Sequence, residues 1–105
     1  MGAPDSLDSR KFMASRWRRR RMCVLIADGP APAAMREINA GGAFLETNAR
    51  PPLGASVELR HPDAGSIFGE VCSIAEDGVG ISFTFGERSV AFALAAIAAD
   101  MSRPG

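Results

Sequence analysis

Two groups of residues in this chain have the types and spacing needed to bind a charged, planar ligand. The first is a run from Arg16 to Arg21 in which Trp17 is the only residue that is not arginine. A guanidinium group donates two parallel hydrogen bonds, which suits a phosphate or the O6/N7 edge of guanine. Trp17 is suited either to stacking on a base or to packing against the domain. The run is therefore a candidate nucleotide site, although taken alone it is equally typical of a solvated tail.

The second group is the segment from Glu37 to Gly42, which contains a carboxylate, the amide of Asn39 and the pair Gly41-Gly42. A carboxylate and an amide together accept and donate hydrogen bonds, as the polar edge of a planar base requires. Paired glycines permit backbone angles that side chains forbid, and they also let another molecule approach the main chain. The alternative for this segment is a simple hairpin turn.

Residues for acid–base, metal or phosphate-loop chemistry are scarce. The only histidine is His61, which lies in a Pro-Asp-Gly turn and is expected to be solvated, and the only lysine is Lys11, so no Walker-type loop is present. Cys23 and Cys72 are the only cysteines and do not form a Cys-x-x-Cys pair, so we expect two buried, reduced thiols. These observations predict a binding module rather than an enzyme, with no metal and no cofactor.

The elements that must position these residues are short and mostly extended. A chain of 105 residues with 47% apolar and 23% charged residues is expected to form one folded domain. The first 15 residues lack periodicity and are expected to be a flexible arm, followed by a domain over 16–105. Apolar segments separated by turn residues predict six strands. The expected strands cover 22–27, 34–38, 43–47, 56–60, 67–74 and 79–85.

Two patterns near the C-terminus predict which side chains are buried. In the last expected strand, Val79, Ile81, Phe83 and Phe85 share one face. Beyond Gly86 the spacing changes to that of a helix, because large apolar residues recur three and four positions apart in an alanine-rich run. We expect these helical residues to cover an apolar opening of the sheet; they are Val90, Leu94, Ile97 and Met101.

Charge is segregated along the chain although the formal net charge is zero. Residues 1–21 hold seven basic and two acidic side chains, a net +5, whereas residues 22–105 hold five basic and ten acidic, a net −5. A dense cationic segment concentrates anions whatever the total charge. No apolar stretch approaches the 18 residues of a spanning helix, and the N-terminus lacks the pattern of a secretory signal. We therefore expect a cytoplasmic protein that is not inserted in a membrane.

The order of these features resembles the PilZ domain family. The resemblance spans about residues 16–101 and rests on an arginine pair four apart, an acidic-x-polar-x-x-Gly turn and the Pro52-Leu53-Gly54 approach to the fourth strand. It also includes the segments 68–71 and 78–83 and the terminal helix. PilZ domains are six-stranded β-barrels, commonly bacterial receptors for cyclic di-GMP. The resemblance thus implies a mostly β fold, a six-stranded antiparallel PilZ-type β-barrel with a C-terminal α-helix.

The family binds its ligand with an Arg-x-x-x-Arg motif and an Asp/Asn-x-Ser-x-x-Gly motif. Arg16 and Arg20 match the first, with Arg21 beside them to steer or stack. On the second motif, Glu37, Asn39 and Gly42 take the acidic, serine and glycine positions. Glutamate moves the acceptor one methylene further out, and asparagine replaces a compact hydroxyl with an amide. The resemblance implies that Arg16, Arg20, Glu37, Asn39 and Gly42 bind cyclic di-GMP, and we expect Arg21 to add to the binding through its charge.

Three functions follow as hypotheses. In the first, the domain is a cyclic di-GMP receptor in which the ligand orders the arginine-rich arm into a surface read by a protein partner. In the second, the altered motif no longer binds the nucleotide, and the domain is an adaptor that contacts proteins, with an exposed Phe44 as one contact; the alternative for Phe44 is burial beneath the terminal helix. In the third, the arm is a nonspecific clamp on nucleic acid. The acidic body argues against the third, so no nucleic-acid polymer is expected as a partner.

Overall fold

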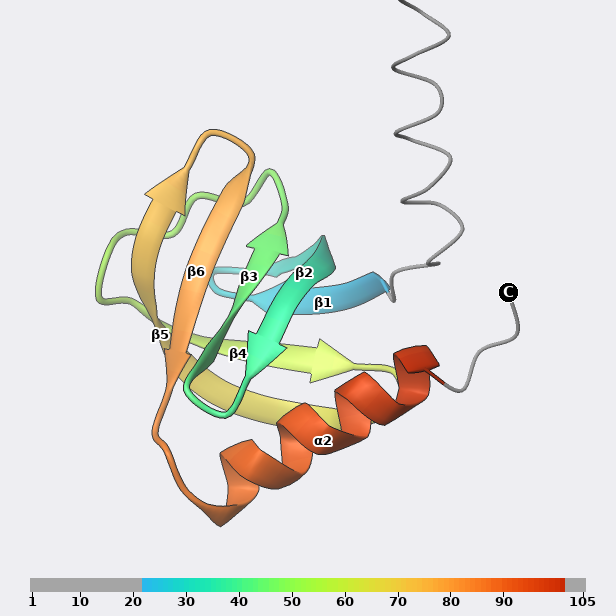
Figure 1. The fold of residues 1–105 in the computed structure, drawn as a ribbon. Coiled ribbons are helices and arrows are strands. Elements are labelled where there is room, and N and C mark those ends of the chain that lie inside the picture. The colour runs from blue at the N-terminus through green and yellow to red at the C-terminus, as the bar shows by residue number, and fades with distance from the viewer. Residues whose placement is uncertain (1–21, 102–105) are drawn as a thin grey trace, which may run out of the picture.

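The structure, a computed structural model, describes residues 22–101. These residues form β1 (Met22–Ile26), β2 (Pro30–Asn39), β3 (Gly42–Glu46), β4 (Ser56–His61), β5 (Gly65–Ala75), β6 (Gly78–Phe83) and helix α2 (Glu87–Met101). The strands pair antiparallel and close in the order β1-β2-β3-β6-β5-β4 (Figure 1). The predicted six-stranded antiparallel barrel with a C-terminal helix is confirmed. The expected arm at residues 1–15 lies outside the described residues.

Alternating side chains fill the interior of the barrel. In β1, Cys23 and Leu25 point inward and are fully buried, while Met22 and Val24 are exposed. The same alternation runs through β3 and β4, as expected for a small closed barrel whose inside is packed with side chains. The fully buried large residues lie at its centre; they are Leu25, Leu45, Leu59, Val79 and Ile81.

Strand β2 begins at Pro30, four residues earlier than the sequence predicted. Its first part, which includes Pro32, pairs with β1 only, because pairing with β3 starts at Ala34. Proline lacks the N–H group that a central strand donates, so it is tolerated where one side of a strand is unpaired. Pro30 and Pro32 therefore belong to the strand, although the sequence predicted that it begins only after them.

Strand β6 ends at Phe83, so the prediction that Phe85 continues its buried face is wrong. The last pair between β5 and β6 joins Gly69 to Phe83. Beyond this pair the chain leaves the sheet for α2, and the alternation of the strand no longer governs side-chain direction. Phe85 is consequently 73% exposed.

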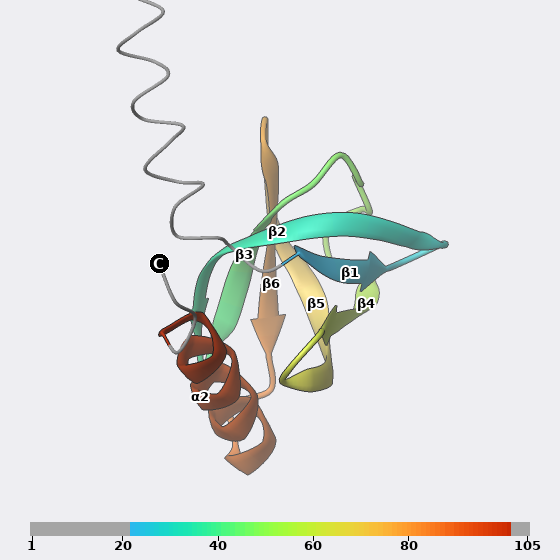
Figure 2. The same cartoon turned by 90° about the vertical axis from the view of Figure 1, so that its right-hand side faces the viewer.

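Helix α2 lies across one end of the barrel, but with a different face from the one predicted (Figures 1 and 2). Its buried residues are Ser89, Phe92, Ala93 and Ala96. Phe92 meets the ring of Phe83 at 5.9 Å between centroids in an edge-to-face arrangement. Small neighbours let the helix axis approach the barrel while this single large ring fills the opening. The predicted stripe of Val90, Leu94, Ile97 and Met101 is 36%, 62%, 37% and 78% exposed.

His61 is buried, so its predicted solvation is also wrong. Its Nδ1 accepts the backbone N–H groups of Asp63 and Ala64, each at 3.0 Å. Its ring also meets that of Phe92, with 6.2 Å between the centroids. These contacts make His61 part of the turn after β4 and of the contact with α2. Within residues 22–101, no helix is long and apolar enough to span a membrane.

Candidate functional site

An open hollow on the outer surface of the barrel brings together all the described residues of the second motif. Its volume is about 360 Å³, within the usual range for ligand pockets. It lies between the β2–β3 turn and strands β5 and β6. The residues that line it are Glu37, Asn39, Gly41, Gly42, Ala43, Phe44, Cys72, Ser73, Gly80, Ile81 and Ser82.

Two β-bulges direct polar side chains toward this surface. In β2 the register shifts between Met35 and Glu37, and in β5 it shifts between Val71 and Ser73. Each extra residue leaves two successive positions outside the barrel, as bulges near functional sites commonly do. Glu37 is thereby exposed on the hollow. The bulge in β5 also explains why the predicted burial of Cys72 is wrong, since that side chain is exposed.

The two thiols differ strongly in their surroundings. Cys23 is fully buried in β1, and burial, with a smaller contribution from the charge of Asp100, raises its pKa to about 11. A thiol with so high a pKa carries little thiolate at neutral pH and reacts slowly. Cys72 instead borders the hollow, on the wall opposite Glu37 and the turn. Only Cys72 is therefore accessible to a thiol reagent.

The floor of the hollow is the backbone of β6. A Cβ atom added at Gly80 would lie 2.3 Å from the Ser73 Oγ and 3.5 Å from the Cys72 Sγ. Because residue 80 has no side chain, these two groups of β5 come close over the β6 backbone. The hollow therefore exposes the Ser73 hydroxyl and the Cys72 thiol on one wall, and Glu37 with the β2–β3 turn on the other.

The side chain of Asn39 holds the β2–β3 turn in shape. Its Oδ1 accepts the N–H of Gly41 at 2.7 Å and the N–H of Gly42 at 3.1 Å. This is an Asx-type turn, in which a side-chain amide replaces a backbone carbonyl. With the oxygen engaged, the Nδ2 amide donors are what Asn39 offers a ligand. The sequence predicted Asn39 as a site residue, but not that its Oδ1 holds the turn while its Nδ2 is left for a ligand.

Glu37 is the free acceptor of the site. Within residues 22–101 its carboxylate forms no hydrogen bond or ion pair. The residue lies opposite Phe44 of β3, beside the extra residue of the bulge. An exposed carboxylate next to the fixed donors of Asn39 can pair with a group that both donates and accepts, such as the edge of a nucleobase.

Gly42 has a structural reason to be glycine. A Cβ atom there would lie 2.3 Å from the carbonyl oxygen of Ile81, closer than carbon and oxygen can approach without moving the backbone of β3 or β6. The strands thus come together only because residue 42 lacks a side chain.

Replacing Gly42 with alanine is expected to destabilise the fold by about 2–3 kcal/mol, because the clash is with backbone and strain of this kind ranks among the larger single-residue effects. Urea unfolding measures the change. Gly41→Ala is the matched control, because its Cβ would meet only the Asn39 Oδ1, at 3.3 Å. Equal losses for the two variants would contradict this account of Gly42.

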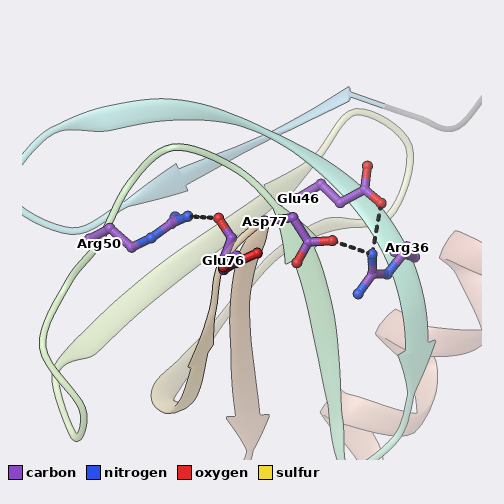
Figure 3. A network of polar contacts seen from close by, with 5 residues as sticks. All are labelled: Arg36, Glu46, Arg50, Glu76 and Asp77. Carbon is purple, nitrogen blue, oxygen red and sulfur yellow. Dashed lines mark hydrogen bonds and ion pairs between the residues drawn. The ribbon is translucent and has the colours of Figure 1, made fainter.

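Arg36, which sequence reasoning missed, lies over Phe44, one of the residues that line the hollow. Figure 3 shows its ion pairs. Its Nη1 donates to Glu46 at 3.1 Å and to Asp77 at 2.8 Å. Its guanidinium also lies 4.2 Å from the ring centroid of Phe44, a cation–π contact. The hydrogen bond between Arg36 and Asp77 lowers the pKa of the Asp77 carboxyl and raises the pKa of the Arg36 guanidinium. The only feature of the sequence that pointed to Arg36 was its position directly before Glu37.

These contacts correct both interpretations of Phe44. The ring is half-buried and carries the Arg36 guanidinium on its face. It is therefore not the exposed apolar contact that the adaptor hypothesis used. The residue that covers the Phe44 ring is Arg36 of β2, and not a residue of the terminal helix as the alternative interpretation expected.

Arg50 holds the loop after β3 against the β5–β6 turn (Figure 3). It donates to the carbonyl oxygens of Thr47 and Glu76, and the Thr47 hydroxyl donates to the Pro32 carbonyl at 2.8 Å. A second hollow of about 410 Å³ lies beside this loop, lined by Met22, Ala31, Pro32, Glu46, Thr47, Asn48 and Asp77. Two carboxylates border it, so it does not suit an anionic ligand.

The arginine motif lies outside the described residues, but the register of β1 shows from which end the chain enters. Ile26 pairs with Pro30 and Met22 with Ala34. Because the two strands are antiparallel, the direction from Ile26 back to Met22 is the direction in which β2 runs toward Asn39. Met22, the first described residue, lies at the end of β1 nearest the β2–β3 turn. Arg16, Arg20 and Arg21 precede it in the chain.

The described part of the site is suited to hydrogen bonding. Among residues 22–101, no group of three or more His, Cys, Asp or Glu side chains is arranged to hold a metal ion. The hollow combines one carboxylate, one oriented amide and two serine hydroxyls, those of Ser73 and Ser82. Comparisons of the chain with protein-family models, with curated proteins and with solved structures gave no match.

Proposed function

We propose that the protein is a single-domain, PilZ-type receptor that binds cyclic di-GMP without catalysing a reaction. The observation that carries the proposal is the hollow on which Glu37, Asn39 and Gly42 meet. Arg16, Arg20 and Arg21 complete the site from the segment before β1. The nucleotide orders this segment into a surface for a protein partner in the cytoplasm.

The chemistry of guanine matches the groups available. Its N1–H and amino group are donors, which suit the unpaired carboxylate of Glu37, and its O6 and N7 are acceptors, which suit the Nδ2 of Asn39. The engaged Oδ1 keeps that amide oriented, so little ordering is needed when the ligand binds. The longer glutamate side chain preserves the acceptor of the family motif.

Covalent geometry allows the arginines to reach the hollow. Successive extended residues advance about 3.3–3.6 Å, so the Arg16 backbone is tied within about 22 Å of Met22 and that of Arg20 within about 7 Å. Asn39 lies five residues along β2 from Ala34, the partner of Met22, or about 17 Å. The two phosphates of the ligand supply the anionic charge that these guanidinium groups need.

The test is calorimetric titration of the full chain with cyclic di-GMP, with linear GMP as the control. We expect a dissociation constant in the micromolar range, which corresponds to about 8 kcal/mol. Saturating nucleotide should also slow alkylation of Cys72 by iodoacetamide at least fivefold, because that thiol borders the hollow. Buried Cys23 is the internal control, because its alkylation would report opening of the fold. No heat at tens of micromolar protein would end the receptor proposal.

A specific observation favours a second candidate, an adaptor that contacts proteins without the nucleotide. The Asn39 oxygen and the absent side chain of Gly42 both serve the turn and the β3–β6 contact. These two motif residues would be needed for folding even if no ligand were bound. Retained binding of a protein partner by an Arg16→Ala/Arg20→Ala variant, together with no nucleotide heat, would support the adaptor.

A further inference from the structure

The apolar side chains that α2 leaves exposed form a continuous stripe along the helix. Val90, Leu94, Ile97 and Met101 are separated by four, three and four residues. This alternation is the spacing of a and d positions in a coiled coil, and it places all four side chains on one seam. The seam lies beside the face that packs on the barrel, not within it.

The rest of the exposed helix surface is also unusual. A surface helix normally carries charged side chains on its outer face. Here the eleven residues from Ser89 to Ala99 include no charged residue, and the solvent-facing positions between the large apolar ones are Ala91, Ala95 and Ala98. Ala91 and Ala98 flank the stripe, where alanine permits close approach of another helix, whereas Ala95 lies further round the helix. The outer side of α2 is clear of the strands in both views (Figures 1 and 2).

We propose that this stripe is a homodimer interface, in which α2 pairs antiparallel with α2 of a second copy. The stripe is self-complementary, as an interface on a two-fold axis requires. Antiparallel alignment places Leu94 of each copy opposite Ile97 of the other, and Val90 opposite Met101, so that every layer pairs an a with a d position. It also opposes the two helix dipoles and separates the Glu87 carboxylates, which parallel pairing would bring together.

The exposed area limits how tightly the two copies bind. From the exposed fractions, the four side chains contribute on the order of 400 Å² of apolar surface per copy, comparable with the largest apolar patch of a typical monomer. Two such stripes with their alanine borders bury roughly 1,000 Å², at the lower end of specific interfaces. Interfaces of this size are typical of weak, transient complexes, so we expect a dissociation constant on the order of 100 µM.

Sedimentation velocity of the full chain, from about 10 µM to about 500 µM, tests the dimer across its expected midpoint. Leu94→Glu should raise the dissociation constant at least tenfold, because it buries a charge at the centre of the seam. Ala95→Glu is the matched control: the same charge is added one residue away, off the stripe, and should change the constant less than twofold. Circular dichroism checks that both variants keep the fold.

Disulfide capture tests the alignment. In a Cys72→Ser background, chains carrying Leu94→Cys are mixed with chains carrying Ile97→Cys under mild oxidation. Antiparallel pairing predicts mainly the mixed disulfide. A monomer throughout the concentration range would overturn the proposal. So would equal dimerisation of the two glutamate variants, or a preference for the Leu94→Cys homodimer.

Discussion

Replacing Arg16 and Arg20 together with alanine is expected to weaken cyclic di-GMP binding by at least about thirtyfold. Each guanidinium is proposed to make one charge-assisted contact, worth about 1–3 kcal/mol, to a phosphate or to a guanine edge. Losing both removes about 2–6 kcal/mol, and the lower limit of that range corresponds to about a thirtyfold change in the dissociation constant. Calorimetric titration of the full chain measures the loss directly.

The matched control for that variant is Arg18→Ala/Arg19→Ala. It removes the same charge from the same segment and leaves the pair spaced by four intact. We expect less than a tenfold loss, because these residues contribute general attraction that salt screens. Equal losses in the two double variants would mean that total charge, and not the motif, binds the anion. Binding would then also fall steeply with added salt.

Phe92→Ala is expected to lower the free energy of unfolding by about 3–5 kcal/mol, the usual cost of truncating a buried aromatic side chain. Phe92 is 3% exposed and contacts the rings of both Phe83 and His61. For a domain of this size the melting temperature should fall by more than about 10 °C. Urea unfolding at low micromolar protein, where the proposed α2 pairing does not contribute, gives the free energy.

Leu94→Ala provides the comparison for Phe92. Leu94 is 62% exposed, so its truncation should cost less than about 0.5 kcal/mol in the monomer. The pair of variants distinguishes the observed helix face from the one that the sequence predicted. A larger loss for Leu94→Ala than for Phe92→Ala would mean that α2 packs on the barrel through the stripe.

The arrangement of the candidate site depends on irregular strands. Glu37 and Cys72 face the hollow because β2 and β5 are bulged beside it. No periodic pattern in the sequence predicts a bulge, since it depends on the register between two strands. Arg36 was missed because its role, too, depends on contacts between elements that are distant in the chain. Its importance comes from Glu46, Asp77 and Phe44, which lie on other elements.

By itself, the sequence was enough to predict the number of strands, the terminal helix, and the position of Glu37, Asn39 and Gly42 around the β2–β3 turn. These features depend on local periodicity and on turn chemistry, which are properties of short segments. The segments expected at 56–60 and 79–85 correspond to β4 and β6, with boundaries shifted by up to two residues.

Only the tertiary structure decided which face of α2 is buried and that His61 is enclosed. The hydrophobic pattern ranked Leu94 above Ala93 and Ala96, yet the barrel selects the small residues, because they let the helix approach closely while Phe92 fills the opening. His61 is enclosed because α2, more than 25 residues away in the chain, lies over its turn. Burial depends on the shape of the surface that a residue meets, and no local pattern contains that shape.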